Sequence, residues 1–138
     1  MKVLQLQCRC GAVQLEVVGP ALAQFYCHCD DCQAMHGAAY VTESIYPAAR
    51  VRVTRGQPTQ WVLRRNPRFA CPTCATRLFV DVLAFEVRGV NGYLLPPGEL
   101  SPSFHMHCRF ALLPVRDGLP HYAGLPERFG GTNETVDW

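Results

Sequence analysis

The densest group of reactive side chains in this 138-residue sequence is a run of three cysteines. Cys27, Cys29 and Cys32 are spaced as Cys-x-Cys and Cys-x-x-Cys. Thiolate sulfur is a strong, soft metal ligand, and these spacings let one turn of backbone direct three sulfurs at one point. We therefore expect a metal ion here, zinc above all. Three protein ligands leave a fourth position open, as in zinc ions that take part in chemistry, so Cys27, Cys29 and Cys32 are the candidate catalytic residues.

Two other interpretations of the same cysteines stay open. Cys27 and Cys32 could form a disulfide and leave Cys29 over, because cysteines two positions apart are poorly placed for the required sulfur dihedral. Alternatively, His28 or His36 could supply a fourth ligand, since imidazole nitrogen binds zinc well beside thiolates. A site closed in this way would favour a zinc-binding interaction module or a thiol-metal carrier over an enzyme.

A second group of cysteines is divided between two distant stretches of the chain. Cys8 and Cys10 precede Gly11, and Cys71 and Cys74 form a Cys-x-x-Cys motif far downstream. Two thiolates do not hold a zinc ion, whereas four close a tetrahedral structural site and tie the two stretches together. We expect a second zinc ion held by these four cysteines. A thioredoxin-like redox pair is disfavoured, because the β-rich sequence after Cys74 lacks the helix that such a motif requires.

Length and composition restrict the class of protein further. The chain predicts one domain over residues 1–138, large enough to bury a core without covalent staples, so its eight cysteines need another explanation. The first residues lack the apolar run of a secretory signal, and no window has the length of a membrane span. A reducing, cytoplasmic setting is therefore expected, where clustered cysteines usually bind metal. The formal net charge of +2 favours neither nucleic acid nor a membrane surface as partner.

Alternation of apolar and polar residues predicts the strands that position these cysteines. The segments 3–7 and 12–18 predict a hairpin with Cys8 and Cys10 at its tip, where Gly11 can take a positive φ. The Cys71 motif likewise lies in a turn between strand-like segments. Further strands are expected in the ranges 38–46, 51–54, 59–64 and 81–90.

The residues after Cys29 predict a short helical turn that Asp30 caps and Gly37 ends. This places Cys32 in the first turn, where the helix dipole and free amides are expected to lower the pKa of its thiol. A lowered pKa favours the thiolate that binds metal.

Near the end of the chain, residues 103–110 predict another strand. Period-two alternation would place His105 and His107 on one face of it and Met106 and Cys108 on the other. Cys108 is expected to be a small buried residue rather than a ligand. The two histidines, taken alone, are more often structural than metal ligands.

These motifs together resemble one known family, the glutathione-dependent formaldehyde-activating enzymes. The resemblance covers nearly the whole chain, and it includes Gly37, His105 and the run Asp117-Gly118-Leu119-Pro120 as well as seven of the cysteines. It implies an all-β fold of antiparallel sheets stacked around zinc sites, similar to the Mss4-like group. One departure is visible, because Ala75 stands where the family usually has glycine. That alanine must adopt a left-handed conformation at a cost of about 1 kcal/mol or reshape the turn.

The resemblance also implies an activity and its parts. Cys8, Cys10, Cys71 and Cys74 match the ligands of a structural zinc, and the three-cysteine run matches the site of a working zinc. The implied reaction joins glutathione and formaldehyde into S-hydroxymethylglutathione, a carbon–sulfur lyase or synthase reaction. The expected partners are therefore a small glutathione-like thiol and a small aldehyde, and two zinc ions per chain are the expected cofactors.

Overall fold

The computed structural model describes residues 2–138, which divide into two compact units. Unit 1 comprises Met1–Ala23 and Ser44–Leu100, and unit 2 comprises Gln24–Glu43 and Ser101–Trp138. Each unit therefore draws on two separate segments of the chain. The prediction of a single domain over 1–138 stays a prediction.

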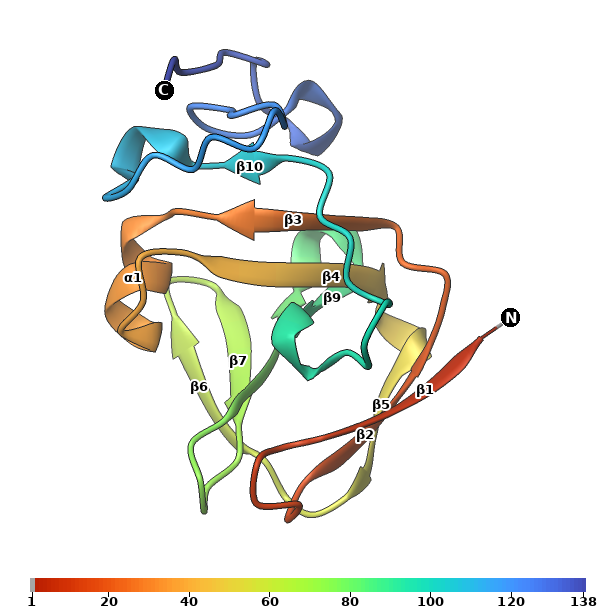
Figure 1. The fold of residues 1–138 in the computed structure, drawn as a ribbon. Helices are drawn as coiled ribbons and strands as arrows, with labels where there is room; N and C mark the ends of the chain where they lie inside the picture. The colour runs from red at the N-terminus through yellow and green to blue at the C-terminus, as the bar shows by residue number, and fades with distance from the viewer. Residues whose placement is uncertain (1) are drawn as a thin grey trace. The chain divides into compact units, whose positions relative to one another are not determined.

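The described residues form ten strands, one α-helix and several short 3-10 helices (Figure 1). The strands are β1 (Val3–Gln7), β2 (Gln14–Val18), β3 (Ala23–Cys27), β4 (Val41–Pro47), β5 (Val51–Arg55), β6 (Thr59–Leu63), β7 (Asn66–Ala70), β8 (Arg77–Val82), β9 (Val87–Asn91) and β10 (His105–Met106). The helix is α1 (Asp30–His36). The 3-10 helices span Ala48–Arg50, Leu83–Phe85, Gly92–Leu94, Cys108–Phe110 and Glu127–Phe129.

Unit 1 contains a three-stranded antiparallel sheet in the order β1-β2-β5. The predicted hairpin is confirmed: Leu6 of β1 pairs with Leu15 of β2, and the alternate residues of both strands are buried. Leu15 and Val17 are fully buried because the period-two pattern directs them to one face of the sheet. They belong to an apolar core that also includes the cysteines Cys8 and Cys71.

The same unit contains an antiparallel run of four strands in the order β9-β8-β7-β6. The turn between β7 and β8 carries Cys71 and Cys74, as predicted. Leu78 and Val90 are fully buried, and the rings of Phe69 and Phe79 stack with centroids 4.4 Å apart. The Cys71 turn is thus attached to a packed strand pair.

Unit 2 contains β3, α1, β10 and the C-terminal segment. β3 and β10 pair in parallel, with Met106 opposite Cys27, and Figure 1 shows the two strands side by side. The helix follows β3 directly and ends at Gly37, whose φ of 60° is left-handed, as predicted. Stacking of Phe25 on Phe104, with centroids 5.2 Å apart, supplies apolar packing within this unit.

Two local predictions in unit 2 are wrong. The helix is capped by Cys29 rather than Asp30, because the Cys29 sulfur accepts the amide of Cys32 at 3.1 Å, and Asp30 occupies the first turn. The strand expected over residues 103–110 is only two residues long. His107 has a φ of 55° and begins a 3-10 helix, so it does not share a strand face with His105.

The fold class predicted from the sequence is confirmed. The described residues are mainly β, with antiparallel pairing throughout unit 1, one parallel pair in unit 2 and a single short α-helix, which fits the expected all-β, Mss4-like class. Within residues 2–138, no helix is long and apolar enough to cross a membrane.

Candidate metal centre

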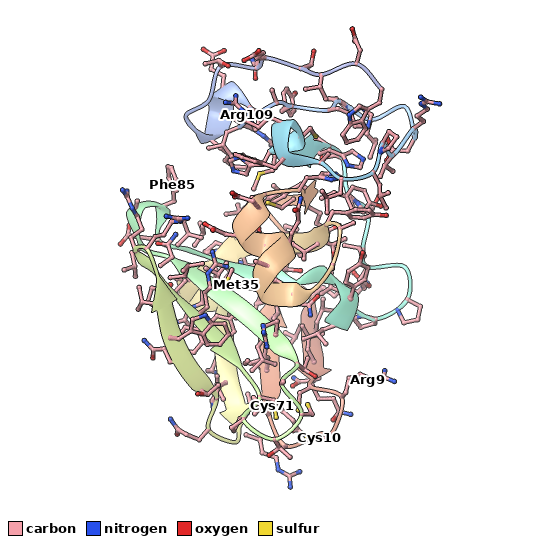
Figure 2. All side chains as sticks on the ribbon, turned by 90° about the vertical axis from the view of Figure 1, so that its left-hand side faces the viewer. Arg9, Cys10, Met35, Cys71, Phe85 and Arg109 are labelled. Atoms are coloured by element: carbon pink, nitrogen blue, oxygen red, sulfur yellow. The ribbon has the colours of Figure 1, made fainter. Side chains whose placement is uncertain are left out.

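The four cysteines expected to form a closed site come together in unit 1. Cys8 and Cys10 lie in the turn between β1 and β2, and Cys71 and Cys74 lie in the turn between β7 and β8. Their four sulfurs all lie within 4.8 Å of one another. Figure 2 shows Cys10 and Cys71 near each other at the tips of these turns. The sequence therefore identified two turns that the fold brings to one point.

The two turns have similar backbone geometry. The amide of Gly11 donates to the carbonyl of Cys8 at 3.0 Å, and the amide of Ala75 donates to the carbonyl of Cys71 at 2.9 Å. Gly11 and Ala75 both have left-handed backbones, with φ of 79° and 64°. Ala75 therefore adopts the strained conformation rather than reshaping the turn. The amide of Arg9 donates to the Thr76 hydroxyl at 3.2 Å and links the two turns directly.

The sulfur spacing in this group fits a tetrahedral zinc ion. Four sulfurs about 2.3 Å from one ion would lie about 3.8 Å from one another. The sulfur of Cys10 lies 3.7 Å from that of Cys8 and 3.8 Å from that of Cys71. Backbone amides also face the sulfurs, since Val13 donates to Cys8 at 3.3 Å. The donor set and its spacing thus suit a closed four-thiolate site.

Hydrogen bonds distribute negative charge unevenly over these four thiols. The hydroxyl and the amide of Thr76 lower the pKa of Cys74 to about 5. Although the hydrogen bond from the Ala12 amide lowers it, the pKa of the exposed Cys10 is raised to about 11, because partial desolvation and the three neighbouring thiols together outweigh that bond. The pKa of Cys8 is lowered as well, so thiolate forms more readily at Cys74 and Cys8 than at Cys10, and a bound cation would favour loss of the remaining protons.

The three-cysteine group lies in unit 2, where β3 ends and α1 begins. The sulfurs of Cys27, Cys29 and Cys32 all lie within 4.8 Å of one another, and no fourth histidine, cysteine or carboxylate of residues 2–138 belongs to the group. The Cys27 and Cys32 sulfurs are 3.7 Å apart, the spacing expected for two ligands of one zinc ion. The Cys29 and Cys32 sulfurs are closer, at 2.7 Å.

Cys29 carries the thiolate of this group. Hydrogen bonds from the thiols of Cys27 and Cys32 lower the pKa of Cys29 to about 3, and the amide of Cys32 adds to the effect. The prediction of a lowered pKa at Cys32 is wrong. Although its contact with Cys27 lowers it, the pKa of Cys32 is raised overall, because Cys29, burial and Glu43 all oppose its ionisation. The free amide of the first helical turn acts on the capping sulfur of Cys29 instead.

The structure bears on both alternatives left open for these cysteines. All eight cysteines are free thiols, so Cys27 and Cys32 do not form a disulfide. His28 is fully buried, and its Nε2 lies 2.9 Å from Nδ1 of His105 rather than among the sulfurs. His36 occupies the last turn of α1 and does not belong to the sulfur group. Neither histidine therefore completes the three-cysteine site.

The contacts of His105 were not anticipated from the sequence. His105, Asp117 and His121 form a third group of ligand-type atoms within 4.8 Å of one another. They come from β10 and from the C-terminal segment, and a single β-bridge joins His105 to His121. Asp117 could have been suspected only from its place in the Asp-Gly-Leu-Pro run, because no alternation or spacing connects it with β10.

Comparisons with known proteins identify the family of this chain. The family profile described as glutathione-dependent formaldehyde-activating enzyme matches residues 3–109. A crystal structure of a Rhodobacter sphaeroides protein has 24% sequence identity to this chain and a TM-score of 0.57, over 70% of this chain and 97% of that one. At that identity the likeness shows the fold alone. No protein of curated function matches the sequence. Because the family profile covers well over half of the chain, the protein belongs to the glutathione-dependent formaldehyde-activating enzyme family.

Proposed function

We propose that this protein joins a small glutathione-like thiol to formaldehyde or a related small aldehyde, as a zinc-dependent carbon–sulfur lyase or synthase. The observation that carries the proposal is the gathering of three sulfurs, those of Cys27, Cys29 and Cys32, without a fourth protein ligand among the described residues. Family membership supports the choice of glutathione and formaldehyde as the first substrates to test.

The two cysteine groups have different roles in this proposal. Cys8, Cys10, Cys71 and Cys74 hold a structural zinc ion, since four thiolates fill a tetrahedral shell. Cys27, Cys29 and Cys32 hold a second zinc ion and leave one position for the sulfur of the substrate. When bound there, zinc lowers the pKa of an incoming thiol, so that the thiol is a thiolate at neutral pH.

The reaction needs a sulfur nucleophile and a place for one proton. The thiol gives up its proton, its sulfur forms a bond to the aldehyde carbon, and the carbonyl π electrons move to oxygen, which takes up a proton. Three cysteine thiolates make a bound cation a weak Lewis acid, so thiol delivery is favoured over polarisation of the carbonyl. Atoms and charge balance with no oxidant or reductant.

Groups of unit 2 hold the three-cysteine site in shape. The side-chain amide of Gln33 donates to the carbonyls of His28 and Phe110, both at 2.8 Å, and so ties α1 to the residue that follows β3 and to the 3-10 helix after β10. Arg109 of that 3-10 helix has an exposed guanidinium 3.9 Å from the carboxylate of Glu134, and a guanidinium is the type of group that binds the carboxylates of glutathione. These contacts define the surroundings in which the substrate thiol would bind.

Calorimetric titration of the zinc-loaded protein tests thiol binding. Glutathione is expected to bind through its sulfur, whereas S-methylglutathione keeps the peptide but cannot present a thiolate and is expected to bind at least tenfold more weakly. A Cys29→Ser variant should reduce the difference between the two ligands. Equal binding of both peptides, or no binding with zinc present, would contradict thiol delivery and favour a non-catalytic zinc module.

A further inference from the structure

Two buried imidazoles and one exposed aspartate of unit 2 form a continuous chain of hydrogen bonds. Nε2 of His28 lies 2.9 Å from Nδ1 of His105, and Nε2 of His105 lies 2.7 Å from a carboxylate oxygen of Asp117. Both imidazole side chains have no exposed surface, while Asp117 is 29% exposed. The chain therefore runs from the segment between two of the site cysteines to the protein surface.

The direction of donation in this chain follows from the carboxylate at its end. Burial alone would raise the pKa of Asp117, but the hydrogen bonds from His105 and the Leu119 amide, together with the two neighbouring imidazoles, hold it below its ordinary value, so Asp117 is ionised and can only accept. Nε2 of His105 must then carry the proton, which leaves its Nδ1 to accept from Nε2–H of His28. Nδ1 of His28 is left as a bare acceptor, and it is buried with no hydrogen-bond partner. One tautomer of each imidazole satisfies every donor in the chain.

The geometry of β3 relates this chain to the cysteines. Tyr26 stacks on His105 with ring centroids 4.5 Å apart, and His28 also contacts His105, so Tyr26 and His28 lie on the same face. Side chains alternate along a strand, so Cys27 points to the opposite face, where its sulfur meets Cys32. The histidine chain thus packs on the face of the Cys27–Cys29 backbone opposite to the Cys27 sulfur. The amide of His28 adds a hydrogen bond to the carbonyl of Met106 at 3.0 Å.

Aromatic rings shield the chain from solvent. His105 is stacked between Tyr26 and His121, and the ring of Trp138 lies edge-on to His28 at 5.4 Å. Hydrogen bonds are stronger in such a low-dielectric setting, and an unpaired donor there is more costly. Loss of the Asp117 carboxylate would therefore weaken the hydrogen bonds of both His105 and His28.

The contacts of these residues fit a metal site at His105, Asp117 and His121 less well than a hydrogen-bond network. Nε2 of His121 donates to the carbonyl of Val115 at 2.7 Å, and both nitrogens of His105 are already engaged. The rings of His105 and His121 also stack with centroids 4.6 Å apart, which directs their lone pairs side by side rather than toward one point. The contacts suit a hydrogen-bond network.

We propose that Asp117 and His105 are positioning residues that fix His28 in one neutral tautomer and orientation and thereby hold the backbone between Cys27 and Cys29. This inference rests on the proposed function, because it assigns the chain to the site at which the substrate thiol would bind. It predicts that damage to the chain loosens the three-cysteine site and leaves the four-cysteine site of unit 1 unchanged.

Nitrogen-15 correlation spectra of the zinc-loaded wild-type protein test the tautomers directly. His28 and His105 are each expected to show a protonated Nε2 and an unprotonated Nδ1 at neutral pH. A proton on Nδ1 of either ring would overturn the proposed chain. This measurement needs no variant and no substrate, so it stands apart from the test of thiol binding.

The positioning role is tested by zinc release to a chelator from Asp117→Asn, His105→Gln and His105→Leu variants. Zinc from the three-cysteine site is expected to leave tenfold or more faster in Asp117→Asn, the size of effect typical of groups that orient metal ligands. His105→Gln, which keeps a donor and an acceptor, should restore more of the wild-type rate than His105→Leu. Asp137→Asn, at an exposed carboxylate of the same unit, is the matched control.

Three outcomes would count against the proposal. Zinc release in Asp117→Asn at the wild-type rate would show that the carboxylate does not support the site. Faster release from both cysteine sites would indicate general destabilisation, which thermal melts of the same variants would reveal. If the wild-type protein bound a third metal ion and Asp117→Asn did not, then His105, Asp117 and His121 would be a metal site instead. If the tautomers and release rates are as expected but glutathione does not bind, the proposed function fails and the positioning role remains.

Discussion

Ala75 shows how a single side chain can be maintained at an unfavourable backbone position. Its φ of 64° lies in the left-handed region, where a Cβ atom is strained. The residue stays there because its amide donates to the carbonyl of Cys71 at 2.9 Å and closes the turn that presents two sulfurs. The strain is therefore a local cost of the metal-binding turn.

Ala75→Gly is expected to stabilise the protein by about 1 kcal/mol, because glycine adopts this conformation without a Cβ clash. Urea unfolding of the zinc-loaded protein measures the change. Gly37→Ala is the control in the opposite direction, since Gly37 has a φ of 60° and open space around the added Cβ. Gly37→Ala should lower the free energy of unfolding by a similar amount. Stabilisation by Gly37→Ala, or destabilisation by Ala75→Gly, would show that backbone strain does not determine these changes in stability.

The two cysteine groups are built from different kinds of element. The four-cysteine group joins two turns distant in sequence, each attached to a buried strand pair, whereas the three-cysteine group occupies one continuous segment from the end of β3 to the first turn of α1. A zinc ion in the first group would cross-link unit 1. A zinc ion in the second would tie together only neighbouring residues, so removing it should disturb the fold much less.

Cys71→Ser is accordingly expected to lower the free energy of unfolding by several kcal/mol or to prevent folding. Cys29→Ser should change it by less than about 1 kcal/mol while abolishing zinc binding at the three-cysteine site. Thermal melts followed by circular dichroism, with metal analysis of each variant, make the comparison. Cys108→Ala, at a buried cysteine outside both groups, serves as the control. Equal damage from Cys71→Ser and Cys29→Ser would refute the division of roles.

The elements nearest the cysteines could largely be predicted from the sequence. Period-two alternation located β1 and β2, the Cys71 motif was correctly placed in a turn between two strands, and Gly37 marked the end of α1, because these signals are local. The prediction failed at Cys29, whose sulfur replaced Asp30 as helix cap. A cysteine cap is not anticipated from ordinary capping preferences, which favour oxygen side chains.

The surroundings of His105 could not be read from the sequence for a different reason. Its strand is only two residues long because His107 turns into a left-handed conformation, and its partners come from residues 117–121 through tertiary contacts. Neither alternation nor motif spacing encodes such contacts. The histidine chain therefore depends on tertiary contacts that no local pattern in the sequence predicts.

Each compact unit contains one complete cysteine group. All ligands expected for the structural zinc belong to unit 1, and all those expected for the working zinc belong to unit 2, together with the histidine chain. Neither group needs a side chain from the other unit to complete its set of sulfurs. Metal binding at the two groups can therefore be measured as two separate processes.

The purified protein is expected to hold two zinc ions per chain that differ in lability. A chelator should remove the ion at the three-cysteine site first, because an open position gives the competing ligand direct access to the metal. Metal analysis during a timed chelator titration, under reducing conditions, follows both fractions. Cys29→Ser should lack the fast fraction only, and a single homogeneous fraction in the wild-type protein would be inconsistent with two different sites.

Burial of His105 predicts how stability depends on pH. Burial lowers the pKa of His105 below its ordinary value of 6.5, although its hydrogen bond to Asp117 opposes the shift. Because the folded state binds the proton less readily than the unfolded state, this contribution to stability is complete above about pH 6.5. It is lost as the pH falls from there toward the folded pKa, with a slope of at most about 1.4 kcal/mol per pH unit for one proton.

Urea unfolding of wild type and His105→Gln between pH 8 and pH 4.5 measures this effect, with the zinc content of both proteins determined at each pH because the substitution is expected to speed zinc release. The difference in unfolding free energy should be constant above about pH 6.5 and should shrink below it. The Asp117 carboxylate, whose pKa is lowered below 3.8, contributes only at more acidic pH, so it does not obscure the window. His28 and His121 face His105. A change in the protonation of His28 on substitution would also affect stability at acidic pH, and spectra of its ring in the variant would reveal it. A difference that stays constant down to pH 4.5 would mean that His105 binds its proton equally well in the folded and unfolded protein, and burial would then not be what keeps the imidazole neutral.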